Sequence, residues 1–262
     1  MDLGLQGRTA FVSGSTQGIG YAVARALASE GVLVTLNGRH RDRLDAAVDR
    51  LRSEVPGASV SGLLADFADA AQVDELLAAL GEVDVLVNNV GLFDVVTFDE
   101  ISDDLWQRYF EVNVMSGVRL SRHALPRMTA RGWGRIVFVA SEAGVDVPAD
   151  MLQYGTTKAA VLALSNGLAK LTRGTGVTVN SVLGGPTWSD GVARAVEDLA
   201  AAQGIGTEVL KTAIAGGRNG LLGRFIEPSE IADLVLYLAS PRSSATNGAA
   251  VRAEGGVLST VL

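Results

Sequence analysis

The stretch Ser13-Gly14-Ser15-Thr16-Gln17-Gly18-Ile19-Gly20 decides how this chain folds. An apolar run at 9–13 precedes it, and residues 19–30 carry apolar side chains at the spacing of a helix. Glycines in such a turn let the backbone approach a pyrophosphate, and the N-terminus of the helix favours negative charge. A glycine-rich turn is often only a tight turn, but its place after the first strand favours a nucleotide site.

Short apolar runs and helical patterns alternate along most of the chain. The expected strands cover 9–13, 32–37, 60–65, 83–88, 135–140 and 177–183, and the expected helices cover 19–30, 41–54, 70–80, 103–131 and 153–173. Strands that are apolar on both faces are typical of a parallel sheet covered by helices on both sides. Because no linker or repeat divides the sequence, we predict one α/β domain over 1–262, with a doubly wound parallel sheet.

One region breaks this alternation. Residues 187–223 are helix-prone but are interrupted by glycines, including Gly204, Gly206 and Gly216. They form either an ordinary surface excursion or a mobile flap. Their position after the last of these strands favours a flap that closes over a substrate.

Composition excludes several classes of function. The 262 residues carry a formal net charge of −7 and no cysteine, which excludes disulfide scaffolds, thiol nucleophiles and iron–sulfur clusters. The acidic balance argues against nucleic-acid binding, which depends on Lys and Arg. No targeting segment or membrane-spanning run is recognisable, so we expect a cytoplasmic protein with no membrane partner. The two histidines, His40 and His123, share no ligand spacing, so no metal site is expected.

The end of the second expected strand bears on the choice of cofactor. It reads Asn37-Gly38-Arg39-His40-Arg41, and no carboxylate occurs before Asp42. An acidic residue here binds the ribose hydroxyls of NAD, whereas an arginine accommodates the 2′-phosphate of NADP. A guanidinium group also suits a phosphate dianion better than a neutral hydroxyl. We therefore predict that NADP(H) is preferred over NAD(H); the alternative is that these arginines only solvate the start of a helix.

Polar residues also follow the third and fourth expected strands. Asp66 either accepts a hydrogen bond from adenine or caps the next helix. Asn88-Asn89-Val90-Gly91 follows the fourth strand, and its amides either bind the cofactor ribose or connect neighbouring turns.

The pair Tyr154 and Lys158 is the strongest indication of chemistry. Residues four apart lie on one face of a helix, so the phenol and the ammonium can reach one ligand. A nearby cation lowers the pKa of a tyrosine, which makes it a proton donor suited to carbonyl reduction. Ser141, at the end of the fifth strand, adds a hydroxyl at the same edge of the sheet. The alternative is an exposed tyrosine beside a surface lysine.

Together these motifs resemble the short-chain dehydrogenase/reductase family, in particular ketoreductases that act on 3-oxoacyl carrier-protein substrates. Gly14, Gly18 and Gly20 are similar to the family's glycine turn, and the 88–91 stretch is similar to its N-N-A-G motif. Asn113 lies 28 positions before Ser141, and Ser141 lies 13 before Tyr154, as in the family's catalytic tetrad. Residues 224–232 and 253–256 resemble its closing helix and strand end. The resemblance covers nearly the whole chain and implies a Rossmann-type sheet of seven strands.

The resemblance also implies roles for individual residues. Tyr154 would be the general acid and base, Lys158 would bind the nicotinamide ribose, Ser141 would orient the substrate oxygen, and Asn113 would hold a relay water. Thr187 would reach the carboxamide of the nicotinamide. The residues expected at the cofactor are Gly14, Ser15, Thr16, Gln17, Gly18, Ile19, Gly20, Asn37, Arg39, Asp66, Phe67, Asn89, Gly91, Tyr154, Lys158 and Thr187.

Two positions depart from the family pattern. Gly184 stands where the family usually has proline, and a freer backbone there predicts a looser loop before Thr187. Glu142 follows Ser141, where a small residue is common, and is either a hydrogen-bond acceptor behind the site or an exposed neutral change.

The expected substrate is a small carbonyl compound or the matching alcohol, held by mainly apolar walls. The residues expected to contact it are Phe93, Glu142, Met151, Leu152 and Trp188. Three functions are compatible with the sequence: an NADPH-dependent carbonyl reductase, which we favour, an NAD(P)-dependent alcohol dehydrogenase working in the oxidative direction, and a nucleotide-binding sensor or scaffold without turnover. The resemblance further implies a homotetramer or homodimer.

Overall fold

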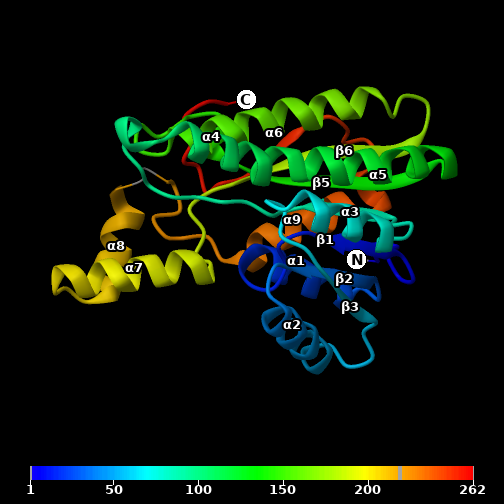
Figure 1. Cartoon of the computed structure of the whole chain (residues 1–262), viewed down its shortest axis with the longest axis horizontal. Coiled ribbons are helices and arrows are strands. Elements are labelled where there is room, and N and C mark those ends of the chain that lie inside the picture. The colour runs from blue at the N-terminus through cyan, green and yellow to red at the C-terminus, as the bar shows by residue number, and fades with distance from the viewer. Residues whose placement is uncertain (1, 218–219, 262) are drawn as a thin grey trace.

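The centre of the molecule is a sheet of seven parallel strands, seen here in a computed structural model that describes residues 2–217 and 220–261 (Figure 1). The strand order is β3-β2-β1-β4-β5-β6-β7. The strands are β1 (Thr9–Val12), β2 (Leu33–Gly38), β3 (Val60–Leu64), β4 (Val85–Asn88), β5 (Trp133–Ser141), β6 (Gly176–Gly184) and β7 (Ala250–Ala253). The predicted doubly wound sheet of the Rossmann type is confirmed.

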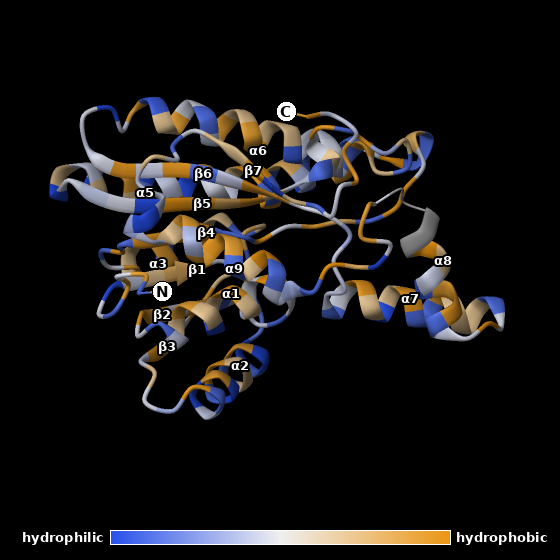
Figure 2. Ribbon diagram, turned by 180° about the vertical axis from the view of Figure 1, so that it is seen from behind, coloured by the Kyte–Doolittle hydropathy of each residue, from blue (hydrophilic) through white to orange (hydrophobic). Residues whose placement is uncertain are grey.

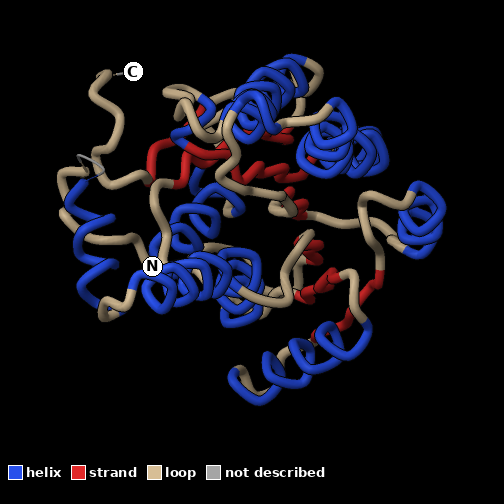
Figure 3. Tube along the Cα trace, turned by 60° about the vertical axis from the view of Figure 1, so that its left-hand side comes forward, coloured by secondary structure: helices blue, strands red, loops and turns tan. Residues whose placement is uncertain are grey.

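Helices cover both faces of this sheet, as the end-on view shows (Figure 3). One face packs against α1 (Gly18–Ser29), α2 (Arg41–Glu54) and α9 (Pro228–Ala239), and the other against α3 (Ala70–Ala79), α5 (Ser116–Arg131) and α6 (Leu152–Lys170). Successive residues of a strand point to opposite faces, so Val137 and Val139 of β5 join the first core and Phe138 joins the second. Most residues of the central strands are accordingly apolar (Figure 2).

The strand order reverses direction between β1 and β4. In open parallel sheets, ligands bind in the crevice at the carboxyl ends of the strands at such a point. The turn from β1 into α1 and the segments after β2, β3, β4 and β5 all leave the sheet at this edge. The motifs singled out in the sequence are therefore brought to one side of the molecule.

The helix expected over 103–131 is interrupted. It consists of α4 (Asp103–Phe110), a π-helical turn (Glu111–Met115) and α5. Asn113 lies inside the π turn, and its amide bonds the backbone of Leu92 and the Thr157 hydroxyl. Single π turns within helices are frequent at functional sites, and apolar periodicity alone does not reveal them.

The predicted flap is a pair of helices, α7 (Asp190–Gln203) and α8 (Thr207–Gly217), set to one side of the sheet (Figure 1). The two helices share a small apolar cluster of their own that includes Val196, Ala200 and Leu210. A bridge between Thr187 and Ile226 closes the base of the flap. Arg218 and Asn219, which the prediction included in the flap, lie outside the described residues.

Throughout residues 2–217 and 220–261, no helix combines the length and the apolar character that crossing a membrane would require.

Helix α6 lies unusually close to the 3-10 turn (Glu142–Gly144) that follows β5. A Cβ added at Gly155 would lie 2.7 Å from the carbonyl oxygen of Ala143 and 2.5 Å from Cγ1 of Val147. The absence of a side chain at Gly155 therefore lets the helix that carries Tyr154 approach the turn that follows Ser141. Gly167, in the same helix, has no atom within 4 Å of an added Cβ.

These two glycines provide a matched pair of substitutions. We expect Gly155→Ala to lower the free energy of unfolding by about 1–3 kcal/mol through overpacking and to reduce turnover by displacing Tyr154. Gly167→Ala is expected to raise the free energy of unfolding by about 0.5–1 kcal/mol, because alanine favours the helix. Urea denaturation and steady-state kinetics of both variants would check this; equal effects of the two would contradict it.

Candidate active site

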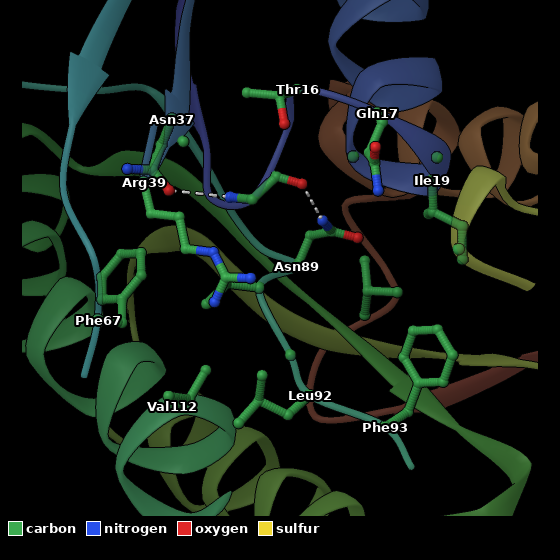
Figure 4. A pocket seen from close by; sticks show the side chains of 18 of the residues that line it. Thr16, Gln17, Ile19, Asn37, Arg39, Phe67, Asn89, Leu92, Phe93 and Val112 are labelled. Atoms are coloured by element: carbon green, nitrogen blue, oxygen red, sulfur yellow. Dashed lines mark hydrogen bonds between the residues drawn. The ribbon is translucent and has the colours of Figure 1, made fainter. Parts of the chain in front are cut away.

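The glycine turn is held closed by two asparagine side chains. A Cβ at Gly20 would lie 2.4 Å from the carbonyl oxygen of Gly14 and 2.5 Å from Nδ2 of Asn89, so no larger residue fits. Nδ2 of Asn89 donates to the carbonyl oxygens of Ser13 at 3.0 Å and Gly14 at 2.9 Å, and Oδ1 of Asn37 accepts from the Gly14 N–H at 3.0 Å (Figure 4). Of the two roles considered for Asn89, the structure shows the connection of turns.

A cavity of about 320 Å³ opens beside this turn at the carboxyl edge of the sheet. Most of the residues predicted for the cofactor line it. They are Gly14, Thr16, Gln17, Gly18, Ile19, Gly20, Asn37, Arg39, Asp66, Phe67, Asn89, Gly91, Tyr154 and Lys158. Ser15 is not among the lining residues: its buried hydroxyl donates to the Val12 carbonyl and accepts from the Asn37 N–H.

Asp66 and Phe67 lie after β3 on the wall of the cavity. The Asp66 carboxylate accepts from the Ala68 N–H at 2.9 Å. It does not cap α3, because the N-cap of that helix is Asp69, which accepts from the N–H groups of Ala71 and Gln72. The capping role considered for Asp66 is therefore wrong.

Two arginines line the same cavity. Arg39 follows β2 and extends into the pocket beside Phe67 (Figure 4). Arg108 comes from α4. Within the described chain neither guanidinium group makes an ion pair, although Arg41 pairs with Asp45. The sequence analysis missed Arg108. Its spacing of four residues from Val112, which also lines the cavity, could have indicated a shared helix face.

Lys158 is a buried cation on the α6 side of the cavity. Its Nζ donates to the carbonyl oxygen of Val139 at 2.8 Å and lies 5.6 Å from the centre of the Tyr154 ring. Burial lowers the pKa of Lys158 to about 8, while the charge of Glu142 acts in the opposite direction. Tyr154 and Lys158 both line the cavity, as their spacing predicts. The alternative of a surface lysine is wrong.

Ser141 ends β5 and is bonded to its neighbour in the chain. Its hydroxyl donates to Oε2 of Glu142 at 2.5 Å and accepts from the N–H of Ala143 at 3.2 Å. The Glu142 side chain is only 9% exposed. Glu142 is therefore a hydrogen-bond acceptor behind the site, and the alternative of an exposed neutral change is wrong.

The Asn113 side chain connects three elements. Its Oδ1 accepts from the Leu92 N–H at 2.7 Å, and its Nδ2 donates to the Leu92 carbonyl and to Oγ1 of Thr157, each at 3.0 Å. Both amide protons are thus used within the protein. A water held by this side chain would have to donate to the remaining lone pair of Oδ1.

The segment before the flap is tighter than the replacement of proline by Gly184 predicts. Gly184 is paired with Ser141 on one side and with Ala253 on the other. A Cβ at Gly185 would lie 2.5 Å from the carbonyl oxygen of Glu254, so this backbone is closely packed. The hydroxyl of Thr187 donates to the Gly185 carbonyl at 2.8 Å, and Thr187 does not line the cavity. The sheet, rather than proline, holds this segment in place.

The residues expected to contact the substrate fall into two groups. Phe93 lines the cavity and faces the flap, since a Cβ on Gly191 would lie 3.2 Å from its ring. Trp188 lies at the base of the flap, with its ring centre 5.2 Å from that of Phe225. Trp188, Glu142, and Met151 and Leu152 at the start of α6 are all outside the lining of the cavity.

The flap touches the glycine turn, which the sequence did not indicate. Oδ2 of Asp190 accepts from the Gly18 N–H at 2.6 Å, and Nη2 of Arg194 donates to Oε1 of Gln17 at 2.8 Å. These pairs are separated by more than 170 positions in the chain. No local pattern predicts such contacts.

Comparison with known proteins agrees with this geometry. The sequence matches the family model described as "short chain dehydrogenase" over residues 8–200. It is 43% identical to the uncharacterized oxidoreductase YvrD of Bacillus subtilis (strain 168), over 98% of this chain and 99% of that protein. The protein belongs to the short-chain dehydrogenase/reductase family. It is therefore an oxidoreductase that acts on CH–OH and C=O groups.

Solved structures of two reductases share the whole fold. L-sorbose reductase from Gluconobacter frateurii, complexed with NADPH and L-sorbose, superposes with a TM-score of 0.94 at 32% identity, covering 100% of both chains. Actinorhodin polyketide ketoreductase with NADPH gives a TM-score of 0.88 at 31% identity, covering 97% of this chain and 98% of the other. The resemblance seen in the sequence is confirmed, and the interpretation as a sensor without turnover is set aside.

The burial of Lys158 predicts a pH-dependent stability. The folded pKa of Lys158 is about 8, below the ordinary value of 10.5. Below pH 8 the group is charged in both states, so the cost of burial is fully present. Between these pKa values the unfolded chain binds a proton that the folded protein has lost, so the free energy of unfolding rises with pH.

We therefore expect wild type to gain up to about 3 kcal/mol relative to Lys158→Met between pH 7 and pH 10, since one pKa unit is about 1.4 kcal/mol. Urea denaturation of both proteins at several pH values would measure the difference. A difference that stays constant with pH would show that Lys158 is not desolvated.

Proposed function

We propose that this short-chain dehydrogenase interconverts a ketone and a secondary alcohol with NADP(H), using Tyr154 as the general acid and base. The observation that carries the proposal is the buried Lys158 ammonium beside Tyr154, on the wall of the cavity that the glycine turn opens. A tyrosine paired with a desolvated cation is suited to proton transfer to and from a carbonyl oxygen.

The cavity has the features that a dinucleotide requires. The glycine turn exposes the N-terminus of α1, which suits a pyrophosphate. Asp66 and Phe67 form the wall expected at the adenine. The guanidinium groups of Arg39 and Arg108, which make no ion pair with the described residues, suit the 2′-phosphate. The complexes of two similar enzymes with NADPH support the same cofactor. When bound, NADPH supplies the hydride for the carbonyl carbon.

The chain's own residues supply the proton and the positioning. The Tyr154 hydroxyl gives its proton to the substrate oxygen in reduction and takes it back in oxidation. The Lys158 ammonium stabilises the tyrosinate by its charge, and it lies where it can bond the ribose of the nicotinamide. Ser141 orients the substrate oxygen. The Asn113 bonds to Leu92 and Thr157 hold the π turn, α6 and the segment after β4 in register around them.

The substrate we propose is an apolar ketone or the corresponding alcohol. Phe93, which is 45% exposed, faces the flap across the entrance and offers an apolar wall. The buried carboxylate of Glu142 lies directly beside Ser141, so a negatively charged group next to the reacting carbon would be repelled there.

Removal of the Tyr154 hydroxyl is the direct test of the mechanism. We expect Tyr154→Phe to lower kcat by about 10²–10⁴-fold, the range typical of general acid–base catalysis, while NADPH affinity stays nearly unchanged. Tyr237→Phe, an exposed position in α9, is the control and should behave as wild type. Turnover of a panel of ketones, followed by loss of NADPH absorbance, measures the effect. Full activity of the Tyr154 variant would refute the role assigned.

Arg39 tests the cofactor preference. We expect Arg39→Ala to weaken NADPH binding by about 10- to 100-fold, the effect of losing a hydrogen bond between charged groups, and to leave NADH binding almost unchanged. Arg41→Ala removes the same charge two residues further on, from a side chain engaged with Asp45, and is the matched control. Fluorescence titrations with both cofactors measure this. Equal losses for NADPH and NADH would contradict a 2′-phosphate contact.

A further inference from the structure

Glu142 is a buried ionisable side chain that the mechanism above leaves unused. It begins the 3-10 turn after β5, and only 9% of its surface is exposed. Burying a carboxylate is costly unless opposite charge and hydrogen bonds compensate. Its surroundings should therefore show what it interacts with.

Two groups of the catalytic set provide that compensation. The Ser141 hydroxyl donates to Oε2 of Glu142 at 2.5 Å, in the range of a charge-assisted hydrogen bond. The second group is Lys158, whose own short bond goes to the neutral carbonyl of Val139. Glu142 is the charged group that raises the pKa of Lys158 against the effect of burial. The turn that Glu142 begins packs against Lys158, since a Cβ at Gly144 would lie 3.1 Å from Cβ of Lys158, and both residues are buried. The carboxylate and the ammonium are thus opposite charges within one desolvated site.

We propose that Glu142 is a positioning residue of the active site, whose carboxylate accepts the hydrogen bond of the Ser141 hydroxyl and provides the counter-charge of the buried Lys158. The proposal rests on the proposed function, because it concerns the same catalytic groups. It adds a fifth side chain to the four that the family resemblance implies.

The first consequence concerns the hydrogen bonds of Ser141. A hydroxyl has one proton and two lone pairs. The Ser141 hydroxyl donates its proton in the hydrogen bond to Glu142, and one of its lone pairs accepts from the Ala143 N–H. These two bonds fix Ser141 in one rotamer. The second lone pair of its oxygen remains to accept a hydrogen bond from the substrate. This suits the hydroxyl of a secondary alcohol.

The second consequence concerns the charge of the site. Tyr154 and Lys158, on α6, line the cavity, and Glu142 lies behind it in the turn after β5. Interacting groups titrate as a set, so the observed pKa values belong to the set. Removing the negative charge of Glu142 lowers the pH at which the Tyr154–Lys158 pair loses its proton. A purely structural role of Glu142 would not shift this pH.

Two variants separate the charge from the hydrogen bond. Glu142→Gln retains an acceptor for Ser141 but removes the charge, whereas Glu142→Asp retains the charge and withdraws it by one methylene. The matched control is Asp146→Asn, which removes one negative charge from an exposed side chain four residues further on. Thermal unfolding and NADPH titration of each variant show whether fold and cofactor site are intact.

We expect Glu142→Gln to move the alkaline limb of kcat/KM for ketone reduction to lower pH by roughly 0.5–1 unit, a modest effect for a charge this close. Glu142→Asp should move it by less, and Asp146→Asn should leave it in place. A second readout needs no cofactor: the near-ultraviolet absorbance of tyrosinate in the apoprotein, with Tyr154→Phe as reference, should shift in the same direction.

An unshifted limb and an unshifted tyrosinate titration in Glu142→Gln would overturn the proposal, as would an equal shift in Asp146→Asn. If Glu142→Gln does not fold, Glu142→Asp carries the test, and the absence of any downward shift there overturns it. Lack of ketone turnover in wild type would instead refute the proposed function, while the apoprotein titration would still report on Glu142.

Discussion

An ammonium group removed from water sets the conditions for the rest of this site. Nζ of Lys158 bonds the Val139 carbonyl, so α6 must lie close against the end of β5. That approach is possible because a Cβ at Gly144 would lie 2.8 Å from the backbone carbon of Lys158. The hydrogen bond that compensates burial of the cation therefore depends on the same close packing that places Tyr154 beside the Ser141 turn. A looser contact would admit water and weaken the electrostatic influence of Lys158 on Tyr154.

Close contacts with the backbone also shape the part of the cavity beside the glycine turn. Asn37 and Asn89 use their amides to hold the glycine turn, and this leaves the N-terminus of α1 exposed at the cavity. The carboxylate of Asp190 already lies on the Gly18 N–H. A negatively charged group is thus bound at this turn by the chain itself, as expected of a helix N-terminus. The Asp190 carboxylate of the flap and a pyrophosphate would both bind at the N-terminus of α1, because the helix dipole favours negative charge there.

Most of the fold followed from local sequence patterns, because buried parallel strands and amphipathic helices differ strongly in periodicity. Helix α2 has the predicted bounds, and β5 exceeds its predicted range only at its ends. The π turn at Asn113 escaped prediction because it depends on bonds to Leu92 and Thr157, which come from other elements. Arg108 was missed for a similar reason: an arginine on an exposed helix is usually solvated, and only the assembled sheet edge brings it to the cavity.

The net charge of the chain does not predict the charge at the cavity. A net charge of −7 and an anionic dinucleotide appear incompatible. At physiological ionic strength, however, interactions between exposed charges are screened beyond about 8 Å, so the groups at the cavity outweigh the distant carboxylates. Arg39 and Arg108 line the cavity without an ion pair among the described residues, and the buried Lys158 lines it as well. An acidic protein can therefore present a locally cationic site, because charges act over the distance at which a ligand meets them.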